Sequence, residues 1–239
     1  MKQDNFKQRQ QKWERKQADY KVNSARQATL VLTLKKTLEL LGDKRRGRLL
    51  DIGCGFGELA ILLAKNTDFE IIGFDISKTS VEAAKANIKK AGLEGRIKIE
   101  EGDVYNLNYP DDYFDAAVSF GYVSAATYPG AQKDVARVLK PEGILICDFI
   151  NCLSLYKIFG SFKRAVNGNS PYYISLSGIK QKFAKESLIF RKQRFFNTYP
   201  PLNLSLSPKV FLVFENTFGR LFKNFLARVR LVCFSYTPK

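Results

Sequence analysis

The chain has 239 residues, of which 45% are hydrophobic, a formal net charge of +16, four cysteines and no histidine. A chain of this length buries one good hydrophobic core, so we expect a single domain over residues 1–239. Because the cysteines show no C-x-x-C spacing and histidine is absent, the composition argues against a disulfide scaffold and a zinc site. The N-terminus is polar and no apolar run approaches the roughly 20 residues of a membrane span, which predicts a soluble, cytoplasmic protein.

The positive charge is concentrated in the two flanks of the chain. Residues 1–48 hold 14 Lys and Arg against 5 Asp and Glu, and residues 151–239 hold 15 against 2. Residues 49–150 hold 10 against 16, so the middle is mildly acidic. Basic flanks attract anionic partners such as nucleic acid, acidic lipid or a phosphorylated substrate, although a high net charge also serves solubility alone.

Helices and strands alternate between residues 24 and 150. The predicted elements are helix 24–41, strand 48–53, helix 58–66, strand 69–76, helix 80–92, strand 96–104, strand 114–121, helix 130–140 and strand 143–150. The strands are near-continuous apolar runs, which is typical of strands buried on both faces. The alternation predicts right-handed βαβ units, and therefore an α/β fold with a Rossmann-like, doubly wound, mostly parallel sheet.

The pattern changes after residue 150. The remaining predicted elements are helix 152–166, helix 176–187, strand 188–196, helix 209–227 and strand 228–237. The helix at 209–227 has one apolar stripe, made of Phe211, Phe214, Phe218, Leu221 and Phe225, with Lys and Arg elsewhere. Two interpretations stay open: the stripe packs on the sheet, or it forms a basic amphipathic surface that approaches an anionic membrane.

The segment "LLDIGCGFGELA" (49–60) places Gly53, Gly55 and Gly57 between the first strand and a helix. Ligands of open parallel sheets bind beyond the carboxyl ends of the strands, and glycine lets a ligand approach the backbone there. A dinucleotide fingerprint is G-x-G-x-x-G, but the spacing here is G-x-G-x-G and Glu58 occupies the position of the third glycine. That carboxylate would repel a pyrophosphate, so the loop predicts a ligand without phosphate.

Two further carboxylates end the following strands. Asp75 ends "IIGFDI", from which a carboxylate can accept hydrogen bonds from both ribose hydroxyls. Asp103 closes the third strand in "EEGDVYNL", where its side chain could meet an exocyclic amine and the N–H of Val104 a ring nitrogen. Each aspartate alone is more typical of a cap or a turn. Their joint placement predicts a nucleoside site.

Four segments in the same order resemble the class I S-adenosylmethionine-dependent methyltransferases: "LLDIGCGFGELA", "GFDIS", "EGDVYNLNYPDDYFDAAVSF" and "VARVLKPEGILICDF". The resemblance implies S-adenosyl-L-methionine as cofactor, and an organisation into an N-terminal helical segment (1–47), a cofactor-binding core (48–150) and a substrate cap with closing strands (151–239). At the third position of "KPEG", this chain has Glu142, whereas the family usually has glycine there. The site residues that the resemblance implies are Asp51, Gly53, Cys54, Gly55 and Gly57 at the methionine part, Asp75 at the ribose, Ile76, Asp103 and Val104 at the adenine, and Ser119 and Phe120 near the reacting methyl.

The acceptor is less well specified. The fourth strand is followed by "SFGYVSAA" rather than N/D-P-P-Y, and no Pro-Cys pair offers a nucleophile for cytosine C5 chemistry. With no histidine, Tyr122 and Tyr128 are the candidate catalytic residues, unless orientation and desolvation suffice. We expect a small-molecule, hydrophobic or lipid-like acceptor, with peripheral contact to an anionic membrane. The alternatives are an RNA methyltransferase that uses the basic flanks and a non-catalytic cofactor-binding subunit.

Overall fold

The computed structural model describes residues 7–11, 14, 24–120, 130–150, 175–196 and 229–238. The predicted helices at 152–166 and 209–227, and the apolar stripe on the latter, lie outside these residues. So do Tyr122 and Tyr128. The elements in chain order are α2 (Ser24–Leu41), β1 (Arg46–Ile52), α3 (Glu58–Asn66), β2 (Asp68–Asp75), α4 (Lys78–Lys90), β3 (Ile97–Glu101), β4 (Phe114–Ser119), α5 (Ala131–Val138), β5 (Leu139–Ile150), α7 (Leu176–Ala184), β6 (Leu188–Phe196) and β7 (Val229–Tyr236).

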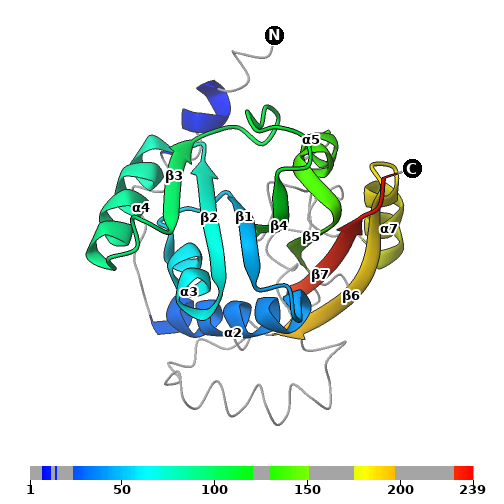
Figure 1. The fold of residues 1–239 in the computed structure, drawn as a ribbon, viewed down its shortest axis with the longest axis horizontal. Coiled ribbons are helices and arrows are strands. Elements are labelled where there is room, and N and C mark those ends of the chain that lie inside the picture. Colours follow the sequence, from blue (N-terminus) through cyan, green and yellow to red (C-terminus); the bar gives the residue numbers. More distant parts are fainter. Residues whose placement is uncertain are drawn as a thin grey trace, which may run out of the picture.

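Seven strands form one sheet in the order β3-β2-β1-β4-β5-β7-β6 (Figure 1). The first five strands along the chain pair in parallel, and β7 runs antiparallel to both of its neighbours, β5 and β6. The strand order reverses between β1 and β4, so the carboxyl ends of these two strands flank the switch point at which such sheets bind ligands. The predicted doubly wound, mostly parallel sheet is confirmed.

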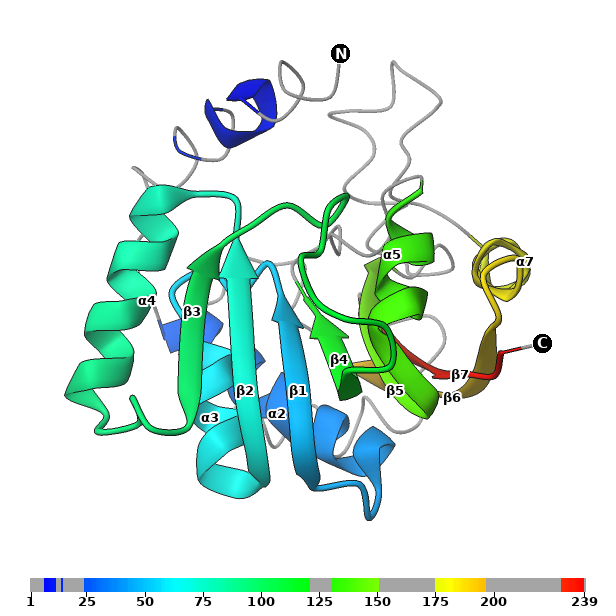
Figure 2. The ribbon, with the colours of Figure 1, turned by 45° about the horizontal axis from the view of Figure 1, so that its top comes forward.

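Helices cover both faces of the sheet, with α2 and α3 on one side and α5 on the other (Figure 2). Successive residues of β1 show how the faces separate. Leu49 packs into the cluster beneath α2, α3 and α4, while Leu50 packs into the cluster beneath α5 and α7, and both are fully buried. The apolar runs of the central strands therefore reflect burial on two faces.

Several boundaries differ from the prediction. β3 ends at Glu101, before Asp103, and β5 starts at Leu139, directly after α5. Glu142 lies in the turn within β5 with a φ of 59°, the left-handed region that glycine adopts without strain. This conformation explains why a glycine would suit the "KPEG" position. Among the helices that the structure describes, none is both long and apolar enough to cross a bilayer.

Candidate functional site

The glycine loop connects β1 to α3 at the carboxyl end of the sheet. Gly53, Gly55 and Gly57 have φ values of 72°, 55° and 73°, so all three adopt the left-handed conformation that side chains disfavour. The N–H groups of Gly53 and Cys54 both donate to the carbonyl of Phe74 in β2, at 2.9 and 3.0 Å. The loop is thus fastened to the next strand and turns tightly before α3.

The glycines have different neighbours. A Cβ added at Gly55 would meet no atom of the described residues within 4 Å, so this position borders open space in the described part of the chain. A Cβ at Gly57 would lie 3.3 Å from the Cβ of Ala84, so this glycine allows α4 to pack against the loop. Cys54 is buried in the core, and burial is the main cause of a thiol pKa well above its usual range. Of Gly55 and Gly57, Gly55 is therefore the one beside which the described residues leave open space.

Asp75 ends β2 beside this loop. Its carboxylate accepts hydrogen bonds from the N–H of Gly55 at 3.0 Å and from the N–H of Ser77 at 2.9 Å. The side chain is mostly buried, which raises its pKa, and the two backbone hydrogen bonds oppose that shift. Asp75 thus ties the glycine loop to the start of α4 while it lies at the strand end that the nucleoside prediction requires.

Asp51 is the most unusual residue of the site. It is 3% exposed, and its Oδ2 atom has no hydrogen-bond partner among the described residues. Burial and the charge of Asp75 raise the pKa of Asp51 to about 7. A buried carboxylate without a partner is costly, and a positively charged group placed beside it would remove that cost. The arrangement therefore fits a ligand that brings a cation to the end of β1.

Asp103 and Val104 lie in a turn after β3. The Asp103 side chain accepts from the N–H of Tyr105 at 3.2 Å, and the Asp103 carbonyl accepts from the N–H of Asn106 at 2.9 Å. Val104 is 5% exposed and anchors the turn in the core beneath α5. The other oxygen of Asp103 forms an ion pair with Arg9.

Arg9 belongs to helical residues 7–11, which lie above the ends of β2 and β3 (Figures 1 and 2). Its guanidinium is 4.5 Å from the ring centroid of Tyr105. The side-chain amide of Gln10 donates to the carbonyl of Ile76 at 3.0 Å and to Glu101 at 2.8 Å. The N-terminal segment therefore contacts the proposed nucleoside residues, a contact that the sequence did not predict because no local pattern encodes it.

Ser119 and Phe120 follow β4 on the other side of the switch point. The Ser119 hydroxyl donates to the carbonyl of Ile52 at 3.2 Å and is fully buried, so it joins the ends of β1 and β4. Phe120 is half-buried and packs against the core beneath α2 and α3. The roles of Ser119 and Phe120 toward a ligand stay predictions.

A surface hollow lies at the amino ends of the strands, far from the glycine loop. Its lining consists of Asp43, Lys44, Arg45, Arg46, Gly47, Asp115 and Lys140. Asp115 is occupied there by an ion pair with Lys140 and by a hydrogen bond from the N–H of Arg48. Ligands of parallel sheets bind at the opposite end, so we place the functional site at the glycine loop.

Residues 49–143 match a protein family described as "Methyltransferase domain". This part of the chain is similar to methyltransferase domains. The matched range runs from the strand before the glycine loop to the turn in β5, and it contains Asp51, Asp75 and Asp103. The class I resemblance of the sequence is thereby confirmed for the core.

Curated relatives of this chain include a demethylmenaquinone methyltransferase of Lactobacillus johnsonii, 30% identical over 162 residues, which are 62% of this chain and 66% of the relative. A sterol 24-C-methyltransferase of Aspergillus fumigatus is 32% identical over 105 residues, which are 44% of this chain and 28% of the relative. The chain thus spans from about a quarter to about two thirds of the length of these relatives.

Solved structures share the fold at low identity. Geranyl diphosphate C-methyltransferase from Streptomyces coelicolor, crystallised with S-adenosyl-L-homocysteine, matches with a TM-score of 0.62 and 12% identity, covering 87% of this chain and 79% of its own. The [4+2]-cyclase SpnF matches with a TM-score of 0.59 and 19% identity, covering 90% and 81%. A cyclase among the matches means that the fold alone does not specify methyl transfer.

Proposed function

We propose that the protein is an S-adenosylmethionine-dependent methyltransferase that acts on a small, hydrophobic or lipid-like acceptor. The observation that carries the proposal is the constellation at the glycine loop: an unpartnered buried carboxylate at Asp51, open space beside Gly55, and Asp75 at the next strand end. S-adenosylmethionine carries an ammonium and a sulfonium, so it brings positive charge without phosphate. Both properties match the site.

Each strand end has a part in this proposal. Asp51 holds the ammonium of the methionine part, Asp75 holds the ribose hydroxyls, and Asp103 with the N–H of Val104 binds the adenine edge. Ile76 flanks the ring. When bound, S-adenosylmethionine supplies an electrophilic methyl group, and the chain's task is to orient the acceptor and to exclude water. Tyr122 and Tyr128 remain the candidates for any proton transfer.

The names of the relatives support a hydrophobic acceptor. They include menaquinone-type and sterol methyltransferases, whose names specify apolar small molecules. The basic residues of 151–239 would suit a surface that meets anionic lipid, so we propose peripheral contact of a cytoplasmic protein with a membrane. An RNA acceptor, the alternative suggested by the same charge, has no support among these relatives.

Cofactor binding is the first experiment. Isothermal titration calorimetry should detect S-adenosylmethionine or S-adenosylhomocysteine and should give weaker or no binding of NAD. Tighter binding of NAD would refute the assignment of the glycine loop. A protein that binds the cofactor but transfers no methyl group to any molecule of a cell extract would be a binding subunit. As the cyclase match illustrates, it could also be an enzyme of another reaction.

The acceptor class is tested with methyl-labelled cofactor and a cell extract that is then separated into lipid, RNA and protein. Label in the lipid or small-molecule fraction is expected, and label in RNA would overturn the acceptor proposal. Binding to anionic vesicles should survive moderate salt in part, because buried apolar area is not screened, whereas binding to a phosphate backbone falls steeply with salt. No vesicle binding at any salt concentration would refute the membrane contact.

A further inference from the structure

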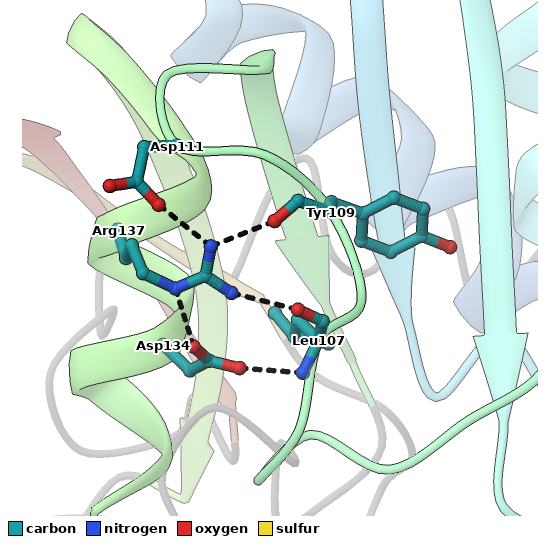
Figure 3. A network of polar contacts seen from close by, with 5 residues as sticks. All are labelled: Leu107, Tyr109, Asp111, Asp134 and Arg137. Carbon is teal, nitrogen blue, oxygen red and sulfur yellow. Dashed lines mark hydrogen bonds and ion pairs between the residues drawn. The ribbon is translucent and has the colours of Figure 1, made fainter.

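Arg137 of α5 makes four polar contacts, three of them to the segment between β3 and β4 and one to Asp134 of its own helix (Figure 3). Its guanidinium donates to the carbonyls of Leu107 and Tyr109, both at 2.7 Å, and to Asp111 at 2.8 Å. Its Nε donates to Asp134 at 2.7 Å, and Asp134 in turn accepts the N–H of Leu107 at 2.5 Å. Both backbone groups of Leu107 are therefore held by one helix.

Leu107 lies directly after the turn that carries the proposed adenine-binding residues. Asp103 and Asn106 pair through their backbones, and the Asp103 side chain caps the turn at Tyr105. Val104 and Leu107 are each 5% exposed and pack into the same core beneath α5. Any displacement of Leu107 would therefore move Asp103 and the N–H of Val104 as well.

The rest of the segment is also held by contacts that do not involve the side chain of Arg137. The hydroxyl of Tyr109 donates to Glu100 of β3 at 2.8 Å, and its ring packs edge-on against Phe114 with centroids 5.0 Å apart. The N–H groups of Asp112 and Tyr113 donate to the carbonyls of Arg137 and Val138. With the segment fixed beyond Leu107, the turn at 103–106 is the part whose position depends on the contact between Leu107 and α5.

We propose that Arg137 and Asp134 are positioning residues that fix the position of the Asp103–Val104 turn relative to the adenine of the cofactor. This inference rests on the proposed function. A hydrogen bond to a base edge tolerates only a few tenths of an ångström before it weakens, so a turn held at one point loses base recognition when that point is released. Arg137 touches no ligand in this arrangement and acts through the backbone of Leu107.

The chain contains a matched control. Arg96 also donates three hydrogen bonds to backbone carbonyls, two to Phe69 and one to Thr67, at the amino end of β2 and away from the glycine loop. Arg137→Gln and Arg96→Gln therefore remove similar arginine contacts, but only those of Arg137 include Leu107. Both substitutions should lower the melting temperature. Only Arg137→Gln should weaken binding of S-adenosylhomocysteine, by about ten- to thirtyfold.

A second readout separates positioning from general loosening. The affinities for S-adenosylhomocysteine and for an analogue whose purine lacks the 6-amino group are compared in each variant. The wild type and Arg96→Gln should prefer the amino-bearing ligand, and Arg137→Gln should lose most of that preference. Arg137→Lys, which retains the charge beside Asp134 but cannot reach both carbonyls, should lose part of it and serves if the glutamine variant does not fold.

The outcomes distinguish this inference from the proposed function. A wild type that does not bind S-adenosylhomocysteine would refute the proposed function. A wild type that binds, together with Arg137 variants that keep both the affinity and the preference for the amino group, would refute the positioning role alone. Equal losses of affinity in Arg96→Gln and Arg137→Gln would assign both arginines to stability and would also overturn the inference.

Discussion

Replacing Asp51 by Asn should stabilise the ligand-free protein at alkaline pH. The amide is nearly isosteric with the protonated acid, so it removes the buried charge while it keeps the shape of the side chain. Burial and Asp75 raise the pKa of Asp51 from 3.8 to about 7. The protonated acid is thus the favoured form in the folded state, and its ionisation costs free energy that the unfolded chain does not pay.

The sign of the pH dependence follows from this raised pKa. The destabilisation is absent below about pH 4, grows as pH rises from there to about 7, and is complete above it. At roughly 1.4 kcal/mol per tenfold change in proton concentration, it amounts to about 2–4 kcal/mol at pH 8. For a chain of this size the Asn variant should then melt several degrees higher than the wild type at pH 8 and at nearly the same temperature at pH 4.

Ligand binding should have the opposite pH dependence, because it should be favoured by the ionised form of Asp51. If the ionised Asp51 holds an ammonium group, wild-type affinity for S-adenosylhomocysteine should rise by up to tenfold per pH unit between pH 5 and 7 and then level off. Asp51→Asn should bind about ten- to a hundredfold more weakly at pH 7.5 and show little pH dependence. Differential scanning fluorimetry and calorimetry at five pH values measure both effects.

Asp68 provides the control, because it is an exposed carboxylate at the other end of β2. Asp68→Asn should change neither the melting curve nor the affinity. A wild type whose affinity is flat between pH 5 and 7, or an Asp51→Asn variant that is no more stable than the wild type at pH 8, would refute the reasoning about the buried carboxylate.

Three further variants test the same site. Gly55→Val should abolish cofactor binding, because its side chain would enter open space at a φ of 55°; circular dichroism must show a folded protein, and normal binding would mean that the loop does not contact the cofactor. Asp75→Ala should weaken binding by about 1.5–3 kcal/mol and also lower the melting temperature, because the N–H groups of Gly55 and Ser77 lose their acceptor; unchanged affinity would show that another acid holds the ribose. Arg9→Ala should bind the cofactor a few-fold more tightly in low salt, because Asp103 loses a competing cation worth about 0.2–1 kcal/mol; weaker binding would instead make Arg9 part of the binding surface.

The sequence predicted the parts of the fold that are encoded locally. Apolar runs located the five parallel strands, and the spacing of Gly53, Gly55 and Gly57 located the loop, because each signal lies within about ten residues. The bounds of β3 were wrong, because the Asp103 side chain caps the N–H of Tyr105 and the chain leaves the sheet before it. A local competition between side chain and backbone decided that boundary.

The missed contacts join residues that are distant in the chain. Arg9 and Asp103 are 94 residues apart, and Arg137 lies 26 to 30 residues after the carbonyls and the carboxylate that it binds. That Asp51 Oδ2 has no partner in the described part of the chain is likewise a property of the packed core and has no sequence signal. Charge pairs of this kind become visible only when the sheet has brought strand ends and helices together.

The position of β7 has a consequence for synthesis of the protein on the ribosome. β7 lies between β5 and β6, yet it is translated after both. Until β7 has emerged from the exit tunnel, β5 keeps an unpaired edge and β6 has no neighbour in the sheet, while the parallel strands are already able to form. The nascent chain thus exposes an unpaired strand edge until β7 emerges, and this is the interval in which a chaperone would be of most use.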